Sequence, residues 1–179
     1  DRPESAKIIH SAIDYGINFI DTSNVYGKGL SEEYIGHALK GRRDEMLIGT
    51  KFGSMRRQGP NNFGGTRAFV IRSVEESLAR LQTDYIDLFL IHWPDHDRAF
   101  SEPMEALEQA KKAGKIRHTG VSNFSVEMMA ESRETSPIIT NQIGYHIFDR
   151  RPEADVMPFV KKNRMGIMAY GSLAHGLLT

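Results

Sequence analysis

Four side chains suited to chemistry on a carbonyl group lie in or directly after three apolar runs of this chain. Asp21 and Tyr26 lie in FIDTSNVYG, Lys51 lies in LIGTKFG, and His92 lies in YIDLFLIHWPD. Tyr26 can donate a proton to an oxygen that gains negative charge when a hydride adds to its carbon. A cation beside a phenol favours the phenolate, and Lys51 is the candidate cation. Asp21 would keep Lys51 charged, and His92 can hydrogen-bond the substrate oxygen.

A hydride must come from a cofactor, because none of these residue types carries one, and a nicotinamide dinucleotide is the simplest choice. No GxGxxG sequence follows an apolar run, and residues 171–176 are not followed by the Lys and the Ser or Thr of a phosphate-binding P-loop. The usual dinucleotide fold is therefore disfavoured. The candidate cofactor contacts lie near strand ends instead: Ser122, Asn123 and Gln142 for a carboxamide, Tyr170 for stacking on the pyridine ring, and the main-chain amides of Gly171, Ser172 and Leu173 for a pyrophosphate.

Apolar runs that alternate with helical patterns predict the elements that position these residues. The runs are apolar on both faces, as is typical of parallel strands covered by helices. This repeat predicts an α/β fold, a parallel (β/α)8 TIM barrel, in which the carboxyl ends of the strands open onto the face that holds the active site. Strands are expected near 19–23, 46–51, 85–92, 116–123, 138–143 and 166–171, and helices at 4–15, from Ser31 to about Gly41, after Thr66, at 103–113, after Ser125 and at 154–163.

The length indicates that the barrel is incomplete. Eight βα units usually need about 250 residues, whereas this chain has 179 residues and starts at Asp1 rather than at a methionine. We therefore expect residues 1–179 to form a single barrel domain with about six visible βα units, which lacks the first strand and the last βα unit of a longer protein. The irregular stretch 54–65 is expected to be a flexible connector rather than a lid.

Composition narrows the classes of partner. Lys and Arg together number 23, as do Asp and Glu, so no basic face is expected for nucleic acid or an anionic membrane. A small-molecule partner is favoured. The chain has no cysteine, which excludes disulfides and thiolate metal sites and fits the cytoplasm. No apolar run approaches the roughly 18 residues of a membrane helix. Nothing in the sequence determines the oligomeric state.

Six motifs, FIDTSNVYG, GTKFG, LIHWPD, GVSNF, TNQ and AYGSLAHGLL, resemble those of the aldo-keto reductases, and the resemblance runs from Asp1 to Thr179. It implies a catalytic tetrad of Asp21, Tyr26, Lys51 and His92, with Tyr26 as the general acid. It also implies a substrate pocket lined by Tyr26, His92 and Trp93, and it places the cofactor on Asp21 and on the candidate cofactor contacts named above. The implied cofactor is NADPH. NADH is the alternative, since the segment that reads the ribose 2′-phosphate lies later in the family's sequences.

The phrasing TSNVYGKGLSEEYIGHAL is most similar to bacterial members that act on small aldehydes and ketones. A second function is open, that of an accessory or sensor subunit resembling potassium-channel β subunits, which use the same barrel to bind a partner and a cofactor. A metal-dependent hydrolase is disfavoured because no HxH motif occurs, and because Pro94 prevents the helical turn that would pair His92 with His96.

Simpler roles for single residues also remain open. A strand-end Asp is commonly a cap, a strand-end Lys is commonly solvated, and a His in an apolar strand commonly belongs to the core. Ser122, Asn123 and Gln142 can equally satisfy loop backbone groups, and Tyr170 can be a core residue.

Overall fold

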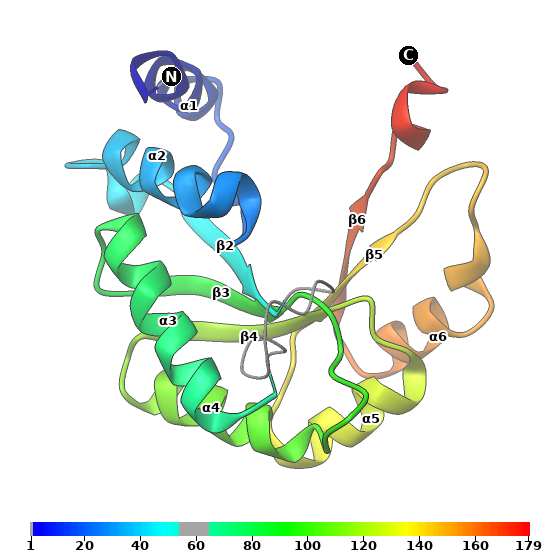
Figure 1. Cartoon of the computed structure of the whole chain (residues 1–179). Coiled ribbons are helices and arrows are strands. Elements are labelled where there is room, and N and C mark those ends of the chain that lie inside the picture. The colour runs from blue at the N-terminus through cyan, green and yellow to red at the C-terminus, as the bar shows by residue number, and fades with distance from the viewer. Residues whose placement is uncertain (1, 54–64) are drawn as a thin grey trace.

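One sheet of six parallel strands, in the order β1-β2-β3-β4-β5-β6, organises the chain in a computed structural model that describes residues 2–53 and 65–179. Neighbouring parallel strands need a crossover connection, and the helices supply these connections on one side of the curled sheet (Figure 1). The predicted fold class is confirmed as a parallel α/β barrel fold, of which the described residues form six strands that alternate with helices. The predicted connector at 54–65 falls almost wholly outside the described residues. The strands are β1 (Phe19–Asp21), β2 (Leu47–Phe52), β3 (Ile86–Ile91), β4 (Ile116–Ser122), β5 (Thr140–Gly144) and β6 (Gly166–Tyr170).

The helices follow one another around the outside of the sheet, and the side between α1 and the C-terminal segment is left uncovered (Figure 1). No helix within the described ranges is both long and apolar enough to cross a membrane. Short 3₁₀ turns at Tyr26–Gly29, Arg43–Glu45, Arg151–Glu153 and Ala174–Gly176 complete the elements. The α-helices are α1 (Arg2–Asp14), α2 (Leu30–Ala38), α3 (Arg67–Leu81), α4 (Ser101–Lys112), α5 (Val126–Thr135) and α6 (Val156–Lys162).

Helix caps explain where two of the predicted helices begin. The hydroxyl of Thr66 accepts a hydrogen bond from the backbone N–H of Phe69, and that of Ser125 accepts one from Met128. The prediction that Ser31 opens α2 is wrong, because the helix begins one residue earlier, at Leu30. Its N-cap is Gly29, whose φ of 95° only glycine adopts readily. The Ser31 hydroxyl instead accepts a hydrogen bond from Thr22 at 2.8 Å.

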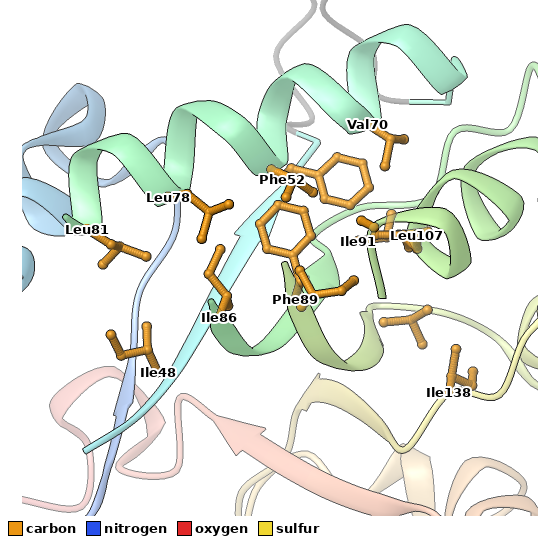
Figure 2. Close-up of a cluster of buried hydrophobic side chains, with 14 of the residues drawn as sticks. Ile48, Phe52, Val70, Leu78, Leu81, Ile86, Phe89, Ile91, Leu107 and Ile138 are labelled. Carbon is orange, nitrogen blue, oxygen red and sulfur yellow. The ribbon is translucent and has the colours of Figure 1, made fainter. Parts of the chain in front are cut away.

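The main core lies between the outer face of the sheet and the helices. The rings of Phe52 and Phe89 on adjacent strands stack with centroids 5.1 Å apart, and the side chains of α3 lie over them (Figure 2). The predicted apolar stripe of α3 is confirmed, because each of its members is buried. These members are Val70, Val74, Ser77, Leu78 and Leu81.

Strand register decides which side chains face the inside of the barrel. Lys51 is in register with Leu90, and Ser122 is in register with Gln142, so each pair shares one face. Because side chains alternate, the neighbours of these residues, such as Phe52, point outward to the helices. The inner face near the carboxyl ends of the strands therefore carries Lys51, Ser122 and Gln142, whereas Phe52 and Phe89 on the outer face join the apolar core.

Candidate active site

Lys51 is the buried cation of the site. It is 0% exposed, near the carboxyl end of β2. Its Nζ donates hydrogen bonds to Oδ2 of Asp21 at 2.8 Å and to the carbonyl oxygen of Thr22 at 2.7 Å. An ammonium without such partners would be costly to bury. The structure thus brings Asp21 and Lys51 together as the sequence predicted.

Tyr26 lies directly beside this ion pair. It opens the 3₁₀ turn Tyr26–Gly29, in which Gly27, Lys28 and Gly29 all have positive φ angles. The Lys51 Nζ is 5.0 Å from the centroid of the Tyr26 ring. Tyr26 is 42% exposed, so a ligand can reach the ring. The turn therefore places a phenol between a buried cation and open solvent.

His92 directly follows β3 and completes the cluster. Its ring centroid is 6.0 Å from that of Tyr26, with the two planes nearly perpendicular at 83°. Its backbone N–H donates to the carbonyl oxygen of Phe52 at 2.8 Å. Burial, followed by charge repulsion from Lys51, lowers the pKa of His92 to about 4, while Asp21 acts in the opposite direction. The imidazole is therefore neutral at pH 7.

Two further contacts in this cluster are not predicted by the sequence. The Ser23 hydroxyl lies 3.2 Å from Nδ1 of His92, and Ser23 is 0% exposed. The Thr22 carbonyl accepts from Lys51, as described above. Both residues lie between Asp21 and Tyr26 in FIDTSNVYG, and this position is the sequence signal that could have indicated a role in the site. Residue type alone does not show that a hydroxyl meets a ring 69 positions later.

Ser122 and Asn123 are largely occupied by contacts within the protein. The Ser122 hydroxyl donates to the backbone oxygen of Gln142 at 2.8 Å. The Asn123 amide nitrogen donates to the carbonyl oxygen of His92 and to Ser122, both at 3.0 Å. The Asn123 side-chain oxygen accepts from the hydroxyl of Tyr170 at 2.8 Å. Ser122 and most of the Asn123 amide are therefore hydrogen-bonded to nearby polar groups of the protein.

Gln142 and Tyr170 remain available to a ligand. Gln142 is 6% exposed, and its side-chain amide has no hydrogen-bond partner among the described residues. Tyr170 is 42% exposed, at the end of β6. The Gln142 amide atoms are not fully shielded from solvent, so a polar ligand group can reach them and pair with them.

A pocket of about 580 Å³ opens beside these residues and includes Asn123, Tyr170 and Gly171 in its lining. Ser172 lines a separate pocket of about 410 Å³, and Leu173 is 59% exposed. Trp93 stacks near His92, with ring centroids 6.3 Å apart. No group of three His, Cys, Asp or Glu side chains that could hold a metal occurs within the described part of the chain.

Comparisons with known proteins agree with this geometry. The aldo-keto reductase YhdN of Bacillus subtilis is 43% identical over 181 residues, which cover 100% of this chain and 55% of that protein. The holo form of aldo-keto reductase AKR11C1 from Bacillus halodurans superposes with a TM-score of 0.90 at 35% identity, covering 100% of this chain and 60% of that one. An aldo/keto reductase from Klebsiella pneumoniae in complex with NADP and acetate superposes with a TM-score of 0.88 at 35% identity, covering 99% of this chain and 61% of that one.

The chain therefore spans somewhat more than half the length of these relatives. The model of the aldo/keto reductase family matches residues 1–179, the whole of this chain. Together with the sheet order and the cluster at the strand ends, this match establishes that the chain belongs to the aldo/keto reductase family.

Proposed function

We propose that this chain carries the active site of an NADPH-dependent oxidoreductase that reduces small aldehydes or ketones to alcohols, with Tyr26 as the general acid. The single observation that carries the proposal is the cluster of an exposed phenol, a buried ammonium and a neutral imidazole at adjacent strand ends. Their spacing suits one carbonyl oxygen placed between Tyr26 and His92. Membership of the family supports the same reaction class.

The residues present fit the nicotinamide end of the cofactor. The free amide of Gln142 can pair with a carboxamide, and the exposed ring of Tyr170 can stack on a pyridine ring. Asn123 keeps one free lone pair on its side-chain oxygen for the same carboxamide. When bound, NADPH supplies the hydride that no side chain can supply. The Klebsiella relative in complex with NADP supports NADPH rather than NADH.

Proton transfer falls to Tyr26. As the carbonyl carbon gains a hydride, its oxygen gains negative charge and takes the proton of the Tyr26 hydroxyl, which leaves a phenolate. Lys51 stabilises that phenolate by its charge, and Asp21 and the Thr22 carbonyl hold Lys51 in place. His92, being neutral, can hydrogen-bond the substrate oxygen without competing for the proton. Trp93, beside His92, would form one wall of the substrate pocket.

Replacing Tyr26 with Phe tests this assignment, because the change removes only the hydroxyl. We expect kcat for reduction of a small aldehyde to fall by about 10²- to 10⁴-fold, which is the range that general acids contribute. Binding of NADPH should persist, and it can be measured as quenching of the fluorescence of Trp93, the single tryptophan of the chain.

Unchanged turnover in Tyr26→Phe would refute the role of Tyr26. Tight binding of NADPH by the unaltered protein, with negligible turnover of all aldehydes and ketones tried, would favour the accessory-subunit function instead.

A further inference from the structure

We propose that Ser23 is a positioning residue that sets the tautomer of His92, so that Nε2 carries the ring proton. This inference rests on the proposed carbonyl reduction for its functional meaning, although the tautomer itself can be measured without any activity. Ser23 touches neither the Tyr26 ring nor the Lys51 ammonium in the contacts of the structure, so it would act through His92.

The hydroxyl of Ser23 has one proton and three acceptors within reach. Nδ1 of His92 is nearest at 3.2 Å, followed by the carbonyl oxygen of Lys51 at 3.4 Å and Oδ1 of Asn24 at 3.5 Å. The backbone N–H of Val25 points to the Ser23 oxygen at 3.5 Å and uses one of its lone pairs. A serine hydroxyl can donate to only one acceptor at a time.

Two arrangements are consistent with a neutral imidazole. In the first, Ser23 donates to a bare Nδ1, and Nε2 carries the proton. In the second, Nδ1 carries the proton and donates to Ser23, whose own proton goes to the Lys51 carbonyl or to Asn24. The two arrangements leave opposite groups on Nε2, a donor in the first and an acceptor in the second.

The surrounding contacts favour the first arrangement. The Lys51 carbonyl oxygen already accepts the backbone N–H of Asn24 at 3.1 Å, so it does not depend on Ser23. Nδ1 of His92 has no other hydrogen-bond partner within residues 2–53 and 65–179. In the first arrangement the Ser23 proton goes to the nearest of its three acceptors, Nδ1 at 3.2 Å, whereas in the second it must go to an acceptor at 3.4 or 3.5 Å.

The consequence lies at Nε2, which has no partner among the residues that the structure describes. With a proton there, His92 can donate to a substrate oxygen, whereas a bare Nε2 would repel the lone pairs of that oxygen. Ser23 would thereby convert a ring that could face substrate in either form into a dedicated donor.

Nitrogen-15 NMR of histidine-labelled protein at pH 7 tests the inference directly. His92 is assigned by the signal that disappears in His92→Gln. We expect a protonated Nε2 and a bare Nδ1 in the unaltered protein. In Ser23→Ala we expect the Nδ1 signal to shift and the protonated form of Nδ1 to become populated. The conservative Ser23→Thr keeps a hydroxyl and should restore the original pattern.

Kinetics supply the second readout. We expect Ser23→Ala to lower kcat roughly tenfold, as the loss of one oriented hydrogen bond predicts, with the NADPH dissociation constant unchanged. A purely structural role would lower the melting temperature and leave the tautomer in place. If Ser23→Ala does not fold, Ser23→Gly removes the same hydroxyl, and the spectrum of the unaltered protein already decides the tautomer.

A protonated Nδ1 in the unaltered protein, or an identical tautomer in Ser23→Ala and the unaltered protein, would overturn the inference. Absence of reductase activity in the unaltered protein would count against the proposed function alone, because the NMR result on Ser23 would still stand.

Discussion

At the scale of single residues, the site is defined by one charge and its neighbours. Lys51 is fully buried, and its charge acts on everything near it, including the imidazole of His92. Asp21 offsets part of that effect, because its negatively charged carboxylate is paired with the Lys51 ammonium. The ionisation of His92 is therefore a sensitive report on the whole cluster.

We predict that His92 titrates with a pKa of about 4, well below the usual 6.5 for histidine. Lys51→Met should raise this pKa by removing a neighbouring positive charge, although burial keeps it below 6.5. Asp21→Asn should lower it, because the favourable negative charge is lost. Proton NMR of the imidazole signal during a pH titration measures all three. Shifts of the same sign in the two variants would contradict the assignment.

The same low pKa links His92 to stability. Between about pH 6.5 and pH 4 the unfolded chain binds a proton at His92 and the folded chain does not. The unfolded state then holds more protons, so the free energy of unfolding decreases as the pH falls through this window. His92→Gln should make the pH dependence shallower there, as measured by urea unfolding at several pH values.

At the scale of elements, a buried carboxylate joins a strand and two helices behind the site. Glu32 of α2 is 0% exposed, accepts from Arg80 of α3 at 2.6 Å, and accepts from the Thr50 hydroxyl of β2 at 2.6 Å. The Arg80 stem lies under Gly29, where an added Cβ would be 2.9 Å from its Cδ. This contact holds the turn that follows Tyr26 and the strand that carries Lys51 in one arrangement.

We predict that Glu32→Ala lowers the free energy of unfolding by about 3 kcal/mol, because it leaves Arg80 without its buried partner. Glu33→Ala is a matched control, since Glu33 is the next residue and pairs with Arg2 at the surface, with 39% of its side chain exposed. Such exposed pairs contribute less than about 1 kcal/mol. Urea unfolding monitored by circular dichroism compares the two, and equal losses would show that the buried pair has no special role.

At the scale of the whole molecule, the sheet curls without closing. Among the described strands, β1 pairs only with β2 and β6 pairs only with β5. The strand β3 is buried along its whole length, whereas β6 has exposed residues at both ends. Large apolar side chains near the two termini are also exposed: Ile8, Tyr15, Ile17, Leu173, Leu177 and Leu178. An open strand edge beside apolar surface is a template for association.

We predict that residues 1–179, produced by themselves, self-associate as their concentration rises, because the β6 edge can pair with another copy. Ala169→Lys places a charge on this exposed edge strand and should shift the equilibrium toward the monomer. Ala130→Lys adds the same charge to an exposed position of α5 and serves as the control. Sedimentation velocity over a concentration series measures the difference. Equal effects of the two lysines would show that general charge, and not the edge, controls association.

Much of the fold could be predicted from local pattern, because each βα unit carries its own signals. The strand at 86–91 is an apolar run apart from Asp87, and the helix after it ends before Gly114, so neither needs distant information. The start of α2 could not be predicted as well. Ser31 has the residue type of a cap, yet its hydroxyl bonds to Thr22, a contact that exists only in the folded chain.

The amino-acid sequence by itself determined the order of the strands and the presence of Asp21, Tyr26, Lys51 and His92 at their ends, because alternating βα units impose that order. Only the tertiary structure decided which polar groups meet. Ser23 contacts a ring 69 positions later, and Asn123 is bound by a tyrosine 47 positions later, while Gln142 is left without a partner among the described residues. Whether such contacts form depends on differences of a few tenths of an ångström in the distance between elements that are far apart in the sequence. Residue type does not encode those distances.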